Sequence, residues 1–105
     1  KKDKVFAIRA SGFSMNKANV GGESVEPGDF VIVDSENKNP QNGEYVLSII
    51  DGVANIKKIN IDKERQQIVL LSESTKDYAP IYIHASASDC YHIGGRIMQV
   101  INKRK

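Results

Sequence analysis

The sequence contains no tryptophan, three prolines, a single cysteine and no long hydrophobic run. One thiol, Cys90, cannot form an internal disulfide, so the chain does not read as a disulfide-stapled secreted domain and suits a reducing compartment such as the cytoplasm. We expect this thiol to be a small buried hydrophobic group. No apolar stretch approaches the roughly 20 residues that a membrane span requires. We therefore expect no membrane segment in the chain.

An excess of charge of one sign is also missing. Fifteen Lys and Arg residues face 13 Asp and Glu residues, which leaves a net charge of +2. The only basic clusters are the two ends, namely Lys1, Lys2 and Lys4 and the tail Lys103–Lys105. A nucleic-acid-binding domain normally gathers its positive charge on one face. This distribution predicts solvated chain ends, and any binding of DNA would need a further segment.

The motifs of metal and phosphate sites are absent as well. His84 and His92 have no Cys or carboxylate at metal-ligand spacing, and neither glycine pair precedes the Gly-Lys-Ser/Thr of a phosphate loop. We therefore predict no metal and no cofactor. A Ser-His-Asp triad stays open on chain order alone, because all three residue types are present, although nothing marks either histidine.

What the sequence does contain is a succession of short strand patterns. Its 105 residues suffice for one domain with one modest core. Almost no helical periodicity occurs, so we predict a mostly β, compact domain of short, twisted antiparallel strands, arranged as a barrel or as folded sheets. The predicted strands are Val5–Arg9, Phe30–Asp34, Glu44–Ile50, Val53–Ile59, Gln67–Leu71, Ile81–Ile83 and His92–Ile101.

Turn residues add local detail to this pattern. Asp51-Gly52 between two β-rich runs predicts a two-residue type I′ hairpin, which would place Lys57 opposite Val46. Residues 16–26 form an irregular stretch in which Gly21-Gly22 suggests a mobile excursion. The Gly94-Gly95 pair predicts a bulge or bend in the last strand.

Two residues suggest chemistry. Ser14 follows a small residue and a glycine at the end of a strand, and Lys57 lies among aliphatic residues about forty positions later. Such a pair can form a Ser/Lys dyad, in which an uncharged lysine takes the proton of the serine hydroxyl. The lysine must then have a pKa below about 10.4, which desolvation provides. Strand alternation puts Lys57 and Lys58 on opposite faces, but both faces are partly apolar, so parity alone does not choose between them.

Longer segments resemble a known family. The residues that carry the resemblance are Ser11–Met15, Val25–Val33, Asn42–Val46, Asn55–Ile59, Leu70–Ser74, Tyr78–Ile81 and Gly94–Ile101. Together they resemble the LexA-type self-cleaving proteins (peptidase S24), which include LexA, lambda-type phage repressors and UmuD. The similarity runs from about Phe6 to Ile101. It implies a LexA/signal-peptidase-like fold with Ser14 as nucleophile and Lys57 as general base. It also implies that the backbone N–H groups of Phe13 and Ser14 form the oxyanion hole.

The resemblance also implies a biological role. In this family the substrate is the protein's own peptide bond, usually between a small residue and Gly, and an activated RecA filament on single-stranded DNA promotes the cleavage. Cleavage separates a DNA-binding domain from a dimerising peptidase domain and relieves repression in the SOS response or in a prophage. No Ala-Gly or Cys-Gly bond precedes Ser14. We therefore expect residues 1–105 to be the carboxy-terminal domain alone, with the cleavage segment and the DNA-binding domain upstream of residue 1.

By the same resemblance we expect a homodimer, with Ile97–Ile101 as the candidate interface. Two other functions stay open. One is a UmuD-type accessory subunit of a translesion polymerase, to which the region from Phe30 to Lys58 is close, and the other is a non-catalytic dimerisation module. Type I signal peptidases share the Ser-Gly-x-Ser-Met start and a later lysine, but this sequence shows neither their membrane anchor nor their additional motifs.

Overall fold

The computed structural model describes residues 4–12 and 14–102, without the side chains of residues 87–89. Within this part of the chain the regular elements are strands and one short 3₁₀ helix, with no α-helix. This confirms the mostly β prediction, whereas the 3₁₀ helix was not predicted. The elements are β1 (Val5–Arg9), β2 (Phe30–Asp34), β3 (Tyr45–Ile50), β4 (Val53–Asp62), β5 (Gln67–Leu71), β6 (Ile81–His84), η1 (Ala85–Cys90) and β7 (Tyr91–Ile101).

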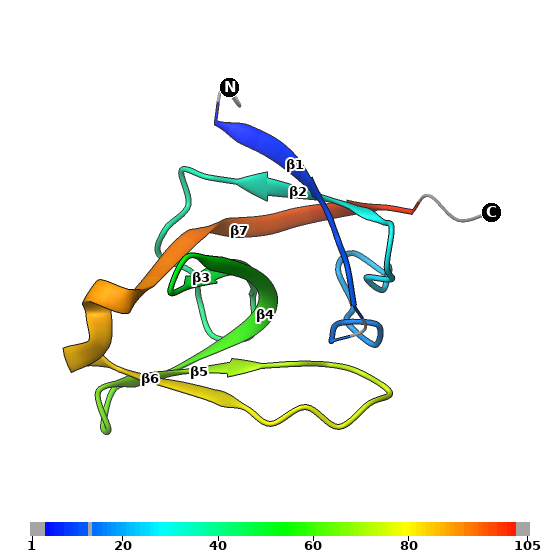
Figure 1. The fold of residues 1–105 in the computed structure, drawn as a ribbon. Coiled ribbons are helices and arrows are strands. Elements are labelled where there is room, and N and C mark those ends of the chain that lie inside the picture. The colour runs from blue at the N-terminus through cyan, green and yellow to red at the C-terminus, as the bar shows by residue number, and fades with distance from the viewer. Residues whose placement is uncertain (1–3, 13, 103–105) are drawn as a thin grey trace.

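The seven strands form one antiparallel sheet in the order β1-β2-β7-β3-β4-β5-β6. The sheet is strongly bent, so that β1, β2 and β7 lie on one side of the β3–β4 hairpin and β5 and β6 on the other (Figure 1). Its edges, β1 and β6, are not paired with each other. The architecture is therefore an open, folded sheet and not a closed barrel.

The turn predictions hold at the β3–β4 hairpin. Asp51 and Gly52 have φ angles of +49° and +82°, the positive values that a type I′ turn requires. The hairpin pairs Lys57 with Val46 and Asn55 with Ser48, as its two-residue turn predicts. The position of Lys57 on β4 therefore follows from the turn chemistry.

The predicted bulge in the last strand is also confirmed. The register between β3 and β7 shifts at Leu47/Ser48, which pair with Gly95 and Ile93, so Gly94 is the extra residue. Gly95 has a φ of +152°, and a Cβ at this position would lie 2.4 Å from the carbonyl oxygen of Asp34. Only glycine lets β7 approach β2 this closely at the bend.

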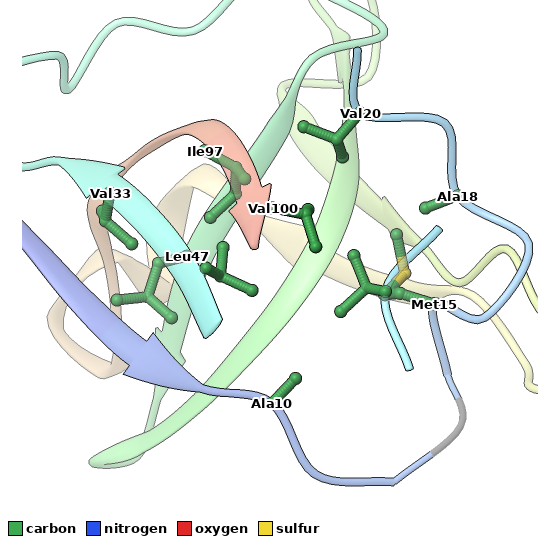
Figure 2. Close-up of a cluster of buried hydrophobic side chains, with 10 residues drawn as sticks. Ala10, Met15, Ala18, Val20, Val33, Leu47, Ile97 and Val100 are labelled. Carbon is green, nitrogen blue, oxygen red and sulfur yellow. The ribbon is translucent and has the colours of Figure 1, made fainter. Parts of the chain in front are cut away.

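Two hydrophobic clusters cover the two faces of the central hairpin. The first lies between β1, β2, β7 and the segment that follows Ser14 (Figure 2) and contains Ala10, Met15, Ala18, Val20, Val25, Val31, Val33, Leu47, Ile97 and Val100. The second lies between β3, β4, β5 and β6 and contains Val46, Ile59, Leu70, Ile83 and Tyr91. Neighbouring residues Val46 and Leu47 thus belong to different clusters, because strand side chains alternate between faces.

The stretch 16–26 differs from its prediction as a mobile excursion. Ala18, Val20 and Val25 are buried in the first cluster, and Val20 pairs with Glu23 across the turn made by Gly21 and Gly22. The glycines supply the positive φ angles of a tight turn, and the apolar residues around them fix the segment to the core. Composition alone suggested mobility because it did not reveal this packing.

The interface predicted at Ile97–Ile101 is only partly exposed in the structure, and it stays a prediction. β7 is an interior strand, paired with β2 on one edge and β3 on the other, and Ile97 and Val100 are buried in the first cluster. Only the residues that alternate outward, such as Gln99 and Ile101, remain on the surface. Cys90 is half-buried instead of buried. No helix in the described part of the chain is long and apolar enough to cross a membrane.

Candidate active site

Ser14 lies in a turn whose two ends are anchored. Before it, the amide of Ala10 donates to the carbonyl of Asp29 (2.8 Å), and the amide of Gly28 donates to the carbonyl of Ala10 (2.9 Å). After it, Met15 is 2% exposed and packs in the first cluster. The Ser14 side chain is half-buried between these two anchors. Contacts on both sides therefore hold the turn that carries the predicted nucleophile.

A cavity of about 240 Å³ opens beside Ser14. One wall is the end of β1 and the following turn, and the facing wall is Ala54–Ile56 of β4. The cavity is smaller than the ~300–1,000 Å³ typical of small-molecule sites. Its size suits a short peptide segment with small side chains. Ser14 thus shares a cavity with the three residues that immediately precede Lys57.

Lys57 is a buried lysine. Its residue is only 6% exposed, and it occupies the same face of β4 as Ile59 in the second cluster. Burial lowers the pKa of the Lys57 amine, because the charged form loses hydration that no carboxylate replaces. Its Nζ donates a hydrogen bond to the Oγ of Ser72 (2.9 Å) and lies 5.9 Å from the ring centroid of Tyr78. Lys57 therefore has the lowered pKa that a lysine needs in order to act as a base.

Lys58 is in the opposite situation. Its Nζ lies 3.1 Å from a carboxylate oxygen of Glu73, and about a third of its side chain is exposed. The hydrogen bond to Glu73 raises the pKa of Lys58. A lysine that is held charged in this way cannot serve as a base near neutral pH. Strand alternation alone did not show which of the two lysines could act as a base. Their environments in the structure favour Lys57.

The segment Ser72–Thr75, directly after β5, connects the two halves of the site. The carbonyl of Glu73 accepts from the amide of Lys17 (2.8 Å). Thr75 and Asn16 exchange two hydrogen bonds, from Asn16 Nδ2 to Thr75 Oγ1 (3.0 Å) and from the Thr75 amide to Asn16 Oδ1 (2.9 Å). Together with the bond from Lys57 to Ser72, these contacts tie the loop of Ser14 and the amine of Lys57 to one short stretch of chain.

Tyr45 completes this network. Its hydroxyl donates to the Glu73 carboxylate and accepts from the amide of Asn19 (3.0 Å). Burial and the bond to Glu73 raise the pKa of Tyr45, so the phenol stays protonated and remains a donor. β3 thereby holds both the segment after Ser14 and the segment after β5.

Ser14 and Lys57 are not hydrogen-bonded to each other in the described structure, where the bond of the Lys57 amine goes to Ser72. The dyad therefore stays a prediction. Of the predicted oxyanion hole, Phe13 lies outside the described residues. Sequence reasoning assigned no role to Ser72, Glu73 or Tyr45, although Ser72 lies opposite Lys57 once the β4–β5 pairing of Lys58 with Leu71 is known.

The alternative chemistries receive no support from the geometry. His84 caps η1, where its Nδ1 accepts from the amide of Ser86 (3.1 Å), and the side chain is exposed. The described residues contain no group of three or more His, Cys, Asp and Glu side chains that could hold a metal ion.

Comparison with known proteins gives consistent matches. The family model described as Peptidase S24-like matches residues 1–98. The LexA repressor of Anaeromyxobacter dehalogenans (strain 2CP-1) is 32% identical over 100 residues, which cover 95% of this chain and 40% of the repressor. Protein ImpA of Salmonella typhimurium is 43% identical over 54 residues, which cover 51% of this chain and 33% of ImpA. The matched part of this chain therefore covers well under half the length of each of these relatives.

Proposed function

The chain belongs to the peptidase S24-like family, and from that premise we propose that it is the Ser/Lys-dyad peptidase domain of a self-cleaving transcriptional repressor. The observation that carries the proposal is Lys57, a lysine that is 6% exposed and whose pKa burial lowers. Keeping such a group in the fold costs stability, which a catalytic role explains. Ser14, on the cavity next to β4, supplies the nucleophile.

The reaction is an acyl transfer in two steps. The neutral amine of Lys57 takes the proton of Ser14 Oγ as the oxygen attacks the carbonyl carbon of a peptide bond in the cavity. Backbone amides of Phe13 and Ser14 stabilise the resulting oxyanion. The Lys57 ammonium then protonates the departing amine, which leaves an ester on Ser14. Water, deprotonated by the same amine, hydrolyses this ester and restores both groups.

The peptide bond lies in the protein itself, upstream of residue 1, between a small residue and Gly. The small cavity beside Ser14 supports a substrate with small side chains. The similarity to LexA repressors supports an upstream DNA-binding domain, a cytoplasmic protein, and cleavage that a RecA filament promotes after DNA damage. In this role cleavage separates DNA binding from dimerisation and so relieves repression.

The match to ImpA favours a second candidate, a UmuD-type accessory subunit of a translesion polymerase. The identity to ImpA is higher than to the LexA repressors, but it extends over only 51% of the chain. Both candidates use the same dyad. They differ upstream of residue 1, where a repressor carries a DNA-binding domain and an accessory subunit carries a short arm.

The outer face of β1, β2 and β7 is the surface we propose for a homodimer. Phe30 and Ile32 of β2 are half-buried there, and Ile101 of β7 is 45% exposed next to Phe30. The guanidinium of Arg9 lies 5.4 Å from the Phe30 ring centroid, at the border of this apolar face. A second copy would cover these side chains without disturbing the paired edges of β7.

Self-cleavage of the full-length protein, incubated without partners from neutral to strongly alkaline pH, tests the proposal. We expect the rate to rise with pH and to level off near the pKa of Lys57, because only the neutral amine acts as base. Ser14→Ala and Lys57→Ala should abolish cleavage. Lys58→Ala, which removes the neighbouring lysine that Glu73 holds charged, is the matched control and should retain it.

Each other result has a definite meaning. A folded full-length protein that contains a small-residue–Gly bond but shows no cleavage at any pH would be a non-catalytic dimerisation module. Cleavage that survives Lys57→Ala would exclude the dyad. Binding of the uncleaved protein to its own promoter DNA, lost after cleavage, would distinguish a repressor from a polymerase accessory subunit.

A further inference from the structure

Ser72 is the hydrogen-bond partner of the buried lysine. Its Oγ accepts from Lys57 Nζ at 2.9 Å, and the residue is half-buried at the end of β5. The register of β4 and β5, which pairs Lys58 with Leu71, puts Ser72 directly across from Lys57. A lysine side chain has four rotatable bonds, so its amine needs such a partner to hold one position.

We propose that Ser72 is a positioning residue that fixes the Lys57 amine for proton transfer from Ser14. This inference rests on the proposed peptidase function. It gives a role to Ser72, a residue that the Ser14/Lys57 mechanism does not include. The hydrogen bond of Ser72 goes to the Lys57 amine, and the Ser72 hydroxyl itself neither forms nor breaks a bond in the reaction. It acts through the direction in which it holds the amine.

The chemistry of the neutral amine supports this role. A neutral lysine amine has two N–H donors and one lone pair, and the lone pair must point at the Ser14 hydroxyl to accept its proton. When one N–H of the amine donates to Ser72, the directions in which the lone pair can point are restricted. A serine hydroxyl is suited to this, because it is uncharged and does not stabilise the ammonium as a carboxylate would.

The chain around Ser72 gives the same residue a fixed position relative to Ser14. The carbonyl of Glu73 accepts a hydrogen bond from the amide of Lys17, and Thr75 exchanges two hydrogen bonds with Asn16. Both partners follow Ser14 by two or three residues. One short segment therefore sets the location of the base, through Ser72, and of the turn that carries the nucleophile.

The test measures how fast Ser14 reacts with a fluorophosphonate, as a function of pH, in the full-length protein. In this reaction a bond forms between Ser14 Oγ and phosphorus, fluoride leaves, and the hydroxyl proton passes to the Lys57 amine. We expect Ser72→Ala to lower the alkaline plateau of the rate roughly tenfold or more, because misplacing a catalytic group costs that much. Ser72→Thr, which keeps the hydroxyl, should restore most of the rate.

The pH profile separates positioning from a general loosening of the fold. Removing Ser72 Oγ takes an acceptor from the ammonium, so the midpoint of the profile should stay in place or move to lower pH. A fold that merely loosens would admit water to Lys57 and move the midpoint up, toward the ordinary lysine value. Ser74→Ala is the matched control, since this serine lies in the same segment and accepts from the Lys76 amide (3.0 Å). It should react at nearly the rate of the unmodified protein.

The outcomes are distinct. An unchanged or faster rate in Ser72→Ala, an upward shift of its midpoint, or an equal loss in Ser74→Ala would overturn the positioning role while leaving the peptidase proposal intact. Labelling of Ser72 instead of Ser14, located by peptide mapping, would make Ser72 the nucleophile and overturn both assignments. If the unmodified protein does not react and does not cleave itself, the proposed function fails and the positioning role fails with it.

Discussion

Lys57 and Lys58 are adjacent in β4, yet their amines lie in opposite electrostatic environments. Lys57 points to the face of the second cluster, is 6% exposed and donates to the uncharged Ser72. Lys58 points to the other face and pairs with the carboxylate of Glu73. Burial lowers the pKa of the first amine, and the bond to Glu73 raises the pKa of the second. One peptide bond thus separates a candidate base from a structural cation.

This contrast predicts the order in which the two amines titrate. We expect Lys57 to lose its proton at lower pH than an ordinary exposed lysine, and Lys58 at higher pH. Heteronuclear NMR of the lysine Nζ and Cε signals over an alkaline titration measures both values, with Lys57→Arg and Lys58→Arg as assignment variants. Equal midpoints for the two residues would contradict the burial argument.

A second prediction concerns stability and its dependence on pH. The folded state holds Lys57 below its ordinary pKa of 10.5, so between the two values the unfolded chain binds more protons than the folded one. The free energy of unfolding should therefore rise with pH through this window, and below the window the buried ammonium destabilises the fold in full. Lys57→Met should stabilise the protein at pH 7 by on the order of 1 kcal/mol.

The gain from Lys57→Met should shrink as the pH rises through this window and vanish above 10.5, where the wild-type amine is neutral in both states. Urea denaturation at neutral and alkaline pH measures the difference. Lys58→Met serves as the control and should give no gain, because it removes the partner of Glu73. A gain that stays constant with pH would show that desolvation of the charge is not its cause.

Much of the fold could be predicted from the sequence because its signals are local. Asp51-Gly52 fixes the register of one hairpin, and the bulge at Gly94-Gly95 follows from the lack of side chains there. The packing of residues 16–26 could not be predicted in this way. Val20 and Val25 are isolated apolar residues in a polar stretch, and their burial depends on distant strands that the local pattern does not reveal.

The site shows the same division. Ser14 and Lys57 could be proposed as a pair. Lys57 is buried, as a lysine base requires, while the pairing itself stays a prediction. Ser72 could not be placed, because its alignment with Lys57 depends on the length of the turn between β4 and β5. That turn, residues 63–66, carries no signal as definite as Asp-Gly, and β4 extends through Asp62 beyond its predicted end. An error of one residue there would have put Ser72 on the other face.

A third prediction tests the network that holds the Ser14 turn. Tyr45→Phe removes a hydroxyl that accepts from the Asn19 amide and donates to Glu73. We expect a loss of about 1.5–3 kcal/mol in the free energy of unfolding, the usual contribution of a hydrogen bond to a charged group. Urea denaturation measures this loss, and faster exchange of the Asn19 amide would locate it. Tyr82→Phe, at a residue that is 62% exposed, should change stability by less than about 0.5 kcal/mol.

The last prediction concerns the outer face of β1, β2 and β7. If this face forms the homodimer, Ile101→Asp should weaken association at least roughly tenfold, because a carboxylate is placed against apolar side chains that the partner covers. Val53→Asp is the matched control, since Val53 is also an exposed aliphatic residue (62%) but lies at the β3–β4 turn. Sedimentation velocity at tens of micromolar measures both variants.

Stability measurements must accompany this experiment, because Ile101 neighbours Phe30 in the sheet and its replacement could also affect folding. An unfolding midpoint close to that of the unmodified protein would assign the loss of association to the interface. A protein that is monomeric without any substitution, or a dimer that Val53→Asp disrupts and Ile101→Asp does not, would place the contact elsewhere. Because both edges of β7 are already paired, a contact made by strand pairing between two copies would have to use β1 or β6, the edge strands of the described sheet.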